Sequence, residues 1–140
     1  MTIYTDGSYK TSQCFTNSKT VEFTSAFLTE KGTIEIQNKI IKRFPELKHY
    51  GNLAELTAIE LAIKYLKKNK TSAPKLFLTD SKTIESWMKS AILGKNKKFA
   101  TKEHSRVYNF LIKNLKNCEI KWVPREQNKI GIILEQLGYY

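Results

Sequence analysis

Aspartate is scarce in this chain of 140 residues, which contains only Asp6 and Asp80 among its 13 acidic residues. Cysteine is equally scarce, and because two cysteines cannot make a disulfide framework we expect a reducing, cytoplasmic location. No unbroken apolar run is longer than three residues, which excludes a transmembrane helix, so we expect no membrane partner. The N-terminus has no basic segment followed by an apolar one, which argues against a signal peptide.

Glycine and arginine are also few, and their positions exclude further classes of protein. The six glycines form neither a phosphate-binding loop nor a dinucleotide fingerprint. Only three of the 24 basic residues are arginines, so the formal charge of +11 comes almost wholly from lysine. Such an excess favours a polyanionic partner, with nucleic acid first. A lysine-rich composition of the kind that AT-rich genomes encode accounts for it equally well, and the charge alone leaves both interpretations open.

The hydrophobic periodicity changes along the chain from strand-like to helix-like. The first forty residues are rich in β-branched and aromatic residues, and their turn signals indicate a meander of three strands. Helical and strand-like segments then alternate, which predicts an α/β fold with a mixed sheet whose faces are covered by helices. No linker or repeat divides the sequence, so we expect one domain over residues 1–140. The predicted strands are 2–9, 14–29, 33–41, 75–80 and 119–123, and the predicted helices are 53–68, 81–93, 105–117 and 129–137.

The two aspartates stand at the ends of predicted strands. Asp6 lies at the end of the first strand, in the turn signal Asp-Gly-Ser, and Asp80 lies at the end of the fourth strand. Ligand sites in α/β sheets collect beyond the carboxyl ends of strands. If the two strands are neighbours, the carboxylates repel each other unless a cation or a shared proton offsets the repulsion. The alternative is that each aspartate is only a turn or cap residue.

A third acidic residue, Glu55, is placed by the period of the first predicted helix. It shares a core-facing stripe with Ile59, one turn further on. The alternative is a capping box, in which Asn52 is the N-cap and Glu55 occupies the third helical position. Glu60 differs, because it is spaced to pair with Lys64 and is expected to be solvated.

Carboxylates at the ends of three different elements suggest a metal site. Hard oxygen ligands of this kind suit Mg²⁺ or Mn²⁺. Zinc is a poor match, because the two histidines and two cysteines do not have zinc-site spacing. Paired divalent ions in a carboxylate cluster support in-line displacement at phosphorus, so the pattern points to phosphodiester hydrolysis.

Four short motifs resemble ribonuclease H of the bacterial type, in the order of that family and over essentially the whole chain. They are IYTDGS at residues 3–8, NLAELTA at 52–58, LTDS at 78–81 and WVPREQN at 122–128. The resemblance implies a ribonuclease H-like mixed five-stranded sheet flanked by helices on both faces. It also implies an endoribonuclease that uses two Mg²⁺ or Mn²⁺ ions to cleave the RNA strand of RNA–DNA hybrids, with no obligatory protein partner.

The resemblance also implies roles for individual residues. Asn52 would contact the minor groove of the hybrid, where 2′-hydroxyl groups distinguish RNA from DNA. The basic stretch at residues 95–98 would be a candidate phosphate-contacting surface, although solvated lysines explain it as simply. The implied catalytic and metal-binding residues are Asp6, Glu55 and Asp80, and the implied substrate-binding residues are Gly7, Ser8, Asn52, Ser81 and Asn128.

The chain departs from the family pattern at the usual fourth acid. That position, four residues after Asn128, holds Ile132, which cannot bind a metal. We predict that Glu135, three residues further on, reaches back as a fourth catalytic and metal-binding residue; the alternative is a solvent-facing glutamate. The family's loop histidine is missing too. Two other functions therefore stay open: a catalytically impaired nucleic-acid-binding domain, favoured by Ile132, and a nuclease for another polynucleotide, which Asn52 disfavours.

Overall fold

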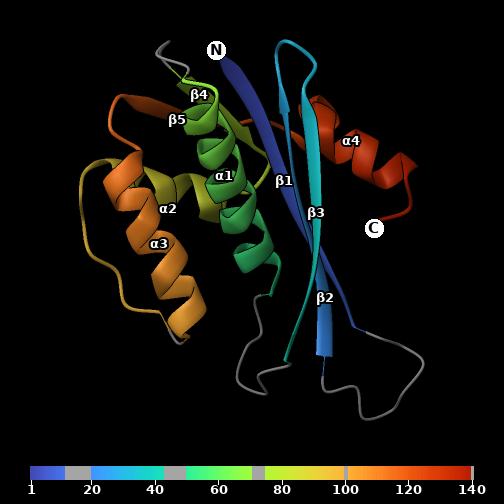
Figure 1. Ribbon diagram of the computed structural model, residues 1–140, viewed down its shortest axis with the longest axis horizontal. Helices are drawn as coiled ribbons and strands as arrows, with labels where there is room; N and C mark the ends of the chain where they lie inside the picture. Colours follow the sequence, from blue (N-terminus) through green and yellow to red (C-terminus); the bar gives the residue numbers. More distant parts are fainter. Residues whose placement is uncertain (12–19, 43–49, 71–74, 100, 140) are drawn as a thin grey trace.

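A five-stranded sheet forms the centre of the computed structural model, which describes residues 1–11, 20–42, 50–70, 75–99 and 101–139. Its strand order is β3–β2–β1–β4–β5, with an antiparallel meander on one side and two parallel strands on the other (Figure 1). The predicted mixed α/β sheet is thereby confirmed. The strands are β1 (Thr2–Thr11), β2 (Thr20–Thr29), β3 (Ile34–Lys42), β4 (Lys75–Thr79) and β5 (Cys118–Trp122).

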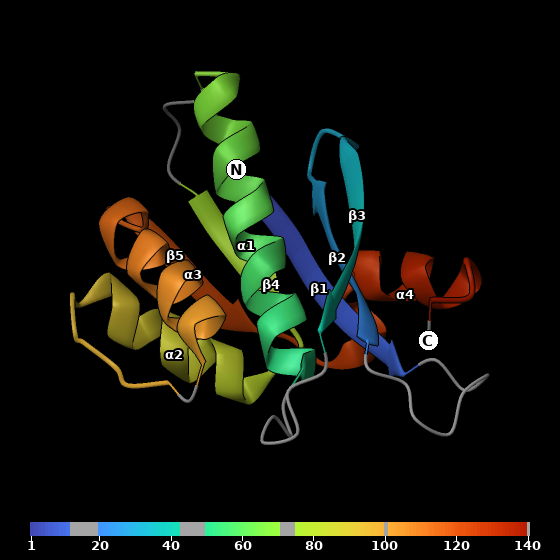
Figure 2. The ribbon, with the colours of Figure 1, turned by 60° about the horizontal axis from the view of Figure 1, so that its bottom comes forward.

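Helices cover both faces of this sheet, as Figures 1 and 2 show: α1, α2 and α3 lie on one face and α4 on the other. The alternation along β1 explains the two layers, because successive side chains of a strand point to opposite faces. Ile3 belongs to the large core beneath α1, α2 and α3, whereas Tyr4 packs against the small cluster beneath α4. The helices are α1 (Tyr50–Lys68), α2 (Lys82–Ile92), α3 (Lys102–Asn114) and α4 (Lys129–Gln136), with a short 3₁₀ helix η1 (Arg125–Gln127) before α4.

The predicted turn at Asp6-Gly7-Ser8 is wrong, because β1 continues through these residues to Thr11. This part of β1 pairs with the antiparallel strand β2, with Asp6 opposite Ala26 and Ser8 opposite Thr24. Asp6 therefore lies within a strand and not at its end. The predicted strand 14–29 is described only from residue 20 onward, and its first part lies outside the described residues.

Two local predictions about α1 are also wrong. The helix begins at Tyr50, so Asn52 lies inside the first turn and is not the N-cap of a capping box with Glu55. Glu60 is not solvated: it is 5% exposed and forms an ion pair of 3.0 Å with Arg106 of α3, besides the expected pair of 3.9 Å with Lys64. The burial of Glu60 arises from a tertiary contact, which a local pattern does not contain.

Among the described residues, no helix combines the length and the apolar character needed to cross a bilayer.

Candidate active site

The strand register places Asp6 beside Asp80. β1 and β4 are parallel and pair Thr2 with Leu76 and Tyr4 with Leu78. The same offset carried two residues further puts position 6 opposite position 80. β4 ends at Thr79, whereas β1 continues, so the two carboxylates meet where the parallel strand stops. This is the edge of the sheet where α/β proteins collect ligand groups.

Glu55 reaches the same place because α1 crosses β1 at Gly7. A Cβ atom at Gly7 would lie 2.4 Å from the carbonyl carbon of Ala54 and 2.5 Å from the backbone nitrogen of Glu55. Only glycine permits this approach. Ser25 of β2 fixes the same turn of the helix, since its hydroxyl donates a hydrogen bond of 2.6 Å to the Ala54 carbonyl oxygen. The backbone of Glu55 is thus pressed directly against the strand that carries Asp6.

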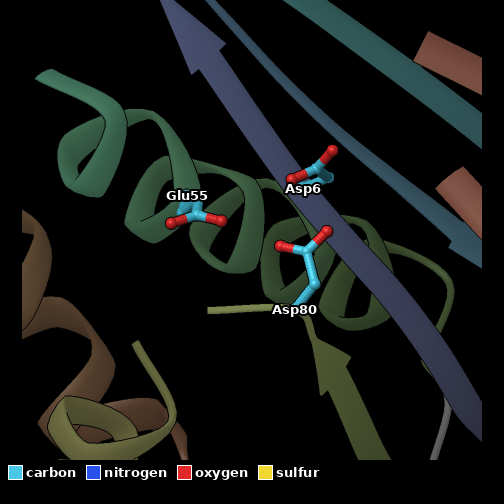
Figure 3. A group of neighbouring side chains, drawn as sticks. All are labelled: Asp6, Glu55 and Asp80. Carbon is cyan, nitrogen blue, oxygen red and sulfur yellow. The ribbon is translucent and has the colours of Figure 1, made fainter. Parts of the chain in front are cut away.

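The three acidic side chains point toward one another from β1, α1 and the end of β4 (Figure 3). Each offers a carboxylate oxygen, and these atoms all lie within 4.8 Å of one another. Asp6 is 1% exposed, the side chain of Asp80 is 9% exposed, and Glu55 is partly buried. The acidic cluster is therefore mostly buried, and Asp6 is its most enclosed member.

Burial and mutual repulsion raise the pKa of two of these groups in the metal-free protein. Burial is the larger cause for Asp6, followed by the charge of Asp80, and its pKa rises to about 7. Burial is again the larger cause for Glu55, followed by the charges of Asp6 and Asp80, and its pKa rises to about 9. A hydrogen bond from Ser81 and the charge of Arg125 partly offset the rise at Glu55. The cluster is therefore short of positive charge.

Comparison with known proteins agrees with this geometry. The family model of RNase H matches residues 1–129. The chain belongs to the RNase H family. No curated protein matches it at a significant level.

Solved structures show the same RNase H fold at low sequence identity. The N-terminal RNase H domain of rv2228c from Mycobacterium tuberculosis is 18% identical with a TM-score of 0.57, over 92% of this chain and 85% of that one. LC11-RNase H1 in complex with an RNA/DNA hybrid is 18% identical with a TM-score of 0.55, over 95% and 91%. The foamy viral protease–reverse transcriptase in complex with an RNA/DNA hybrid is 24% identical with a TM-score of 0.57, over 95% of this chain but only 18% of that one.

The segment between β5 and α4 holds Asp80 of this RNase H from outside the acidic cluster. Arg125 places its guanidinium 3.6 Å from Asp80 Oδ2. Asn128 Nδ2 donates hydrogen bonds to the same Oδ2 at 3.3 Å and to the Thr5 carbonyl oxygen at 3.1 Å. Sequence reasoning gave Arg125 no role, although it stands in the motif at residues 122–128. The signal that the sequence offered for Arg125 was its position three residues before Asn128, a predicted substrate-binding residue.

Trp122 holds the backbone of Asp80. Its indole Nε1 donates a hydrogen bond of 3.1 Å to the Asp80 carbonyl oxygen, and its backbone nitrogen donates one of 2.7 Å to Glu85 of α2. The Lys82 ammonium lies 4.8 Å from the centre of the Trp122 ring. The indole therefore joins β5, α2 and the acidic site.

Helix α4 brings no acid to the cluster. Among the described residues, the acidic group contains only the three carboxylates named above, and Glu135 lies exposed on the helix surface. Ile132 is 37% exposed. In α4, a Cβ atom built at Gly131 would lie 3.0 Å from Asp6 Oδ2 and 3.6 Å from Asp80 Oδ2. The role predicted for Glu135 stays a prediction.

The predicted substrate-binding residues divide into two groups. Asn52 is half-buried in the first turn of α1, and Ser81 is half-buried as the N-cap of α2. The other three are engaged within the protein. Gly7 packs under α1, Ser8 donates a hydrogen bond of 3.0 Å to the Tyr139 carbonyl oxygen, and Asn128 is fully buried. Their predicted contact with substrate is untested, and their visible contacts position the site.

The residues present fit a divalent cation. Three converging carboxylate oxygens are the ligand type of Mg²⁺ and Mn²⁺, and a bound cation would offset the mutual repulsion that contributes to the raised pKa values of Asp6 and Glu55. Within the described residues, Asn128 Oδ1 is a buried side-chain oxygen without a hydrogen-bond partner. A neutral oxygen of this kind is also acceptable to a hard cation.

The metal-free protein should lose stability as the pH rises from about 5 to about 8.5. A carboxyl group whose pKa is raised on folding binds more protons in the folded state, so its contribution is largest below the unfolded pKa and is lost as the pH approaches the folded one. Asp6, near 7, and Glu55, near 9, both act in this direction. Thermal melts in EDTA at several pH values measure the effect, at roughly 2–4 °C per kcal/mol.

Added Mn²⁺ should reverse this loss, and more strongly at pH 8 than at pH 5, because protons compete with the cation for the same oxygens. Asp6→Asn should flatten the pH dependence. A melting temperature that rises with pH across this window in EDTA would contradict the expected repulsion within the cluster.

Proposed function

We propose that this RNase H chain is a Mg²⁺- or Mn²⁺-dependent endoribonuclease that hydrolyses the RNA strand of RNA–DNA hybrids. The observation that carries the proposal is the convergence of three carboxylates from β1, α1 and the end of β4, with ligand atoms within 4.8 Å. Two of the related structures are complexes with an RNA/DNA hybrid. Retention of all three acids supports an enzyme, since a protein that only binds gains nothing from buried carboxylates that repel each other.

In this proposal the three acidic residues bind the cation, and neighbouring residues hold them in position. Asp6, Glu55 and Asp80 would hold the cation, which when bound would lower the pKa of a coordinated water and offset charge on the phosphodiester. The structure fixes Asp6 through the strand, Glu55 through the contact of α1 with Gly7, and Asp80 through Asn128. In-line attack of water on the phosphodiester would leave a 5′-phosphate and a 3′-hydroxyl.

Exposed polar and basic residues support a nucleic-acid substrate. Asn52 is partly exposed one helical turn before Glu55, where an amide can reach the 2′-hydroxyl groups that mark RNA. Lysines 95, 97 and 98 are exposed after α2, and Lys97 lies 5.3 Å from the Trp87 ring centre. A net charge of +11 adds sequence-independent attraction to phosphates.

Cleavage of a labelled hybrid tests the proposal. Purified protein is incubated with an RNA–DNA hybrid, double-stranded RNA, double-stranded DNA and single strands, each with Mg²⁺, Mn²⁺ or EDTA. We expect cleavage of the hybrid alone, in the RNA strand, with either metal and not in EDTA. Hybrid binding without cleavage in either metal would instead support a non-catalytic binding domain, the candidate that Ile132 and the exposed Glu135 favour. Cleavage of DNA would indicate a different nuclease.

A two-ion mechanism would need a further oxygen ligand, and Glu135 is the acid that we predict supplies it. Glu135 lies four residues after Gly131, and residues so spaced share a helix face. Helical side chains lean toward the N-terminus, so a glutamate there can extend over a glycine. If it binds the second ion, Glu135→Gln should lower kcat by about 10–100-fold at low Mg²⁺ with partial recovery at high Mg²⁺. Gln136→Ala, an exposed neighbour, is the control, and unchanged cleavage by Glu135→Gln would remove this residue from the site.

A further inference from the structure

We propose that the free edge of β3 is a self-association surface, through which two copies of this chain pair antiparallel and join their sheets. β3 lies at one end of the strand order, at the outer margin of the antiparallel meander (Figure 2). The inference goes beyond the proposed nuclease activity and does not depend on it. It rests on the backbone groups that this edge leaves open and on a side-chain pattern that is complementary to itself.

The backbone of β3 presents a defined row of groups away from the sheet. The Thr29 nitrogen donates a hydrogen bond of 2.9 Å to the Thr33 carbonyl oxygen, and the register with β2 continues without a break from Leu28 opposite Ile34. Hydrogen-bonded and non-bonded pairs alternate along an antiparallel ladder. The N–H and C=O groups of residues 35, 37 and 39 therefore bond to β2, and those of residues 34, 36, 38 and 40 point outward. In the part of the chain that the structure describes, no strand covers this outer row.

The opposite edge of the sheet is protected in a way that β3 is not. β5 has only five residues, and the backbone nitrogen of its last residue, Trp122, donates a hydrogen bond of 2.7 Å to the Glu85 carboxylate of α2. Short length and cover by a helix are common protections of edge strands. β3 has nine residues, and its side chains at positions 34, 35 and 37–40 are exposed. A strand of this length with an open edge is a template for a further strand.

The side chains of β3 select one register for a second copy. With the two-fold axis at Gln37, Glu35 of each copy lies opposite Lys39 of the other. The same register sets Ile34 opposite Ile40, and it aligns the outward-facing backbone groups of the two copies with each other. Two ion pairs and two isoleucine pairs then form between the copies, and cross-strand pairs of both kinds stabilise sheets.

Other registers that preserve the backbone hydrogen bonds are less favourable. An axis at Glu35 or at Lys39 sets like charges opposite each other, and an axis at Ile36 or Asn38 places both charged residues opposite uncharged ones. Residues 34–40 contain one acid and one base, so this strip is neutral in a chain whose formal charge is +11. Two copies therefore meet with less repulsion here than along a lysine-rich surface.

The contacts within one copy leave these side chains accessible. Lys39 lies 3.8 Å from Glu103 of α3, but its side chain is 46% exposed, so an acid of a second copy can approach it from solvent. On the opposite face of the strand, Ile36 packs against the small cluster beneath α4. Ile34 and Ile40 belong to neither core and are 43% and 70% exposed. Pairing with a second copy covers this apolar surface.

Sedimentation of the full chain over a range of concentrations tests the proposal. At about 0.15 M salt the Debye length is roughly 8 Å, which screens the general repulsion between two basic chains. We expect a weak dimer with a dissociation constant on the order of 10–100 µM, because the interface is small. Glu35→Lys should weaken it by at least about tenfold, since like charges replace both ion pairs. Glu35→Lys combined with Lys39→Glu restores opposite charges and should recover most of the affinity.

Amide hydrogen exchange of the wild-type chain identifies the surface without any substitution. The amides of residues 34, 36, 38 and 40 should exchange at least about threefold more slowly when the chain is mostly dimeric than when it is dilute. The amides of residues 35, 37 and 39, which bond to β2 in each copy, should change little. Ile40→Lys should abolish the dimer, and Leu93→Lys is its matched control, because Leu93 is also 70% exposed but lies at the end of α2.

Three results would overturn the proposal. The first is a chain that stays monomeric at about 1 mM, well above the expected dissociation constant. The second is a dimer that Glu35→Lys leaves intact or whose outward-facing amides exchange at an unchanged rate, since another surface would then form it. The third is protection of these amides only after addition of an RNA–DNA hybrid, which would assign the edge to nucleic acid.

Discussion

Asp6→Asn should reduce hybrid cleavage by at least about 10³-fold while raising the thermal stability of the metal-free protein at pH 8. The first effect follows because Asp6 lies at the closed end of the cluster, 1% exposed, where no solvent oxygen can replace it easily. A bound cation contributes several kcal/mol to charge stabilisation, and each 1.36 kcal/mol corresponds to a tenfold change in rate. The second follows because the amide removes a buried charge that Asp80 repels.

These opposite changes separate a lost ligand from a damaged fold. Thermal melts in EDTA and cleavage rates in Mg²⁺ should be measured on the same preparations, with Mn²⁺ titration as a third readout. Glu119→Gln, an exposed carboxyl-to-amide change on β5, is the matched control and should leave all three unchanged. If Asp6→Asn cleaved the hybrid at the wild-type rate, Asp6 would not be a metal ligand.

Gly7→Ala should both destabilise the protein and disable the site. The new Cβ would lie 2.4 Å and 2.5 Å from backbone atoms of Ala54 and Glu55, so α1 has to move away from β1. Overpacking of a core commonly costs about 1–3 kcal/mol, or roughly 2–12 °C in melting temperature for a domain of this size. A displacement of about 1 Å at a catalytic group can cost about 10²-fold in rate. We therefore expect a loss of that order in kcat for hybrid cleavage, because Glu55 moves with the helix.

Gly51→Ala is the matched glycine control. Its Cβ would be 3.7 Å from the Tyr9 ring, an ordinary contact, and the residue lies within α1. Alanine is favoured over glycine in a helix by about 0.5–1 kcal/mol, so this variant should melt at the wild-type temperature or slightly above it. A Gly7→Ala protein with wild-type stability and cleavage would show that α1 does not need this close approach.

The position of the acidic cluster could be predicted because it depends on patterns that the sequence carries locally. Strand-like runs around Asp6 and before Asp80 and the helical period around Glu55 indicate the elements that carry the three carboxylates, although Asp6 lies within β1 and not at its end. Because β1 and β4 are neighbouring parallel strands in one sheet, their register brings positions 6 and 80 together.

What the sequence did not reveal depends on contacts between distant segments. In isolation, an aspartate, Gly7 and a serine in sequence form a turn signal. In the structure, glycine is required at this position because the backbone of α1 packs directly against β1. Glu60 is buried by Arg106, which lies 46 residues away and binds it with two nitrogens. The ion pair of Arg125 with Asp80 is likewise a long-range contact that no period predicts.

The hydrogen bond from Trp122 to the Asp80 carbonyl oxygen gives the protein an intrinsic optical reporter. Indole fluorescence responds to the hydrogen bonding and charge around the ring, and Trp122 also lies beneath the Lys82 ammonium. The only other tryptophan, Trp87, packs edge-on against Phe99 and can be replaced by phenylalanine. In such a single-tryptophan protein, cation loading at Asp80 and approach of a phosphate to the neighbouring lysine could be followed without a label, as two separable changes in emission.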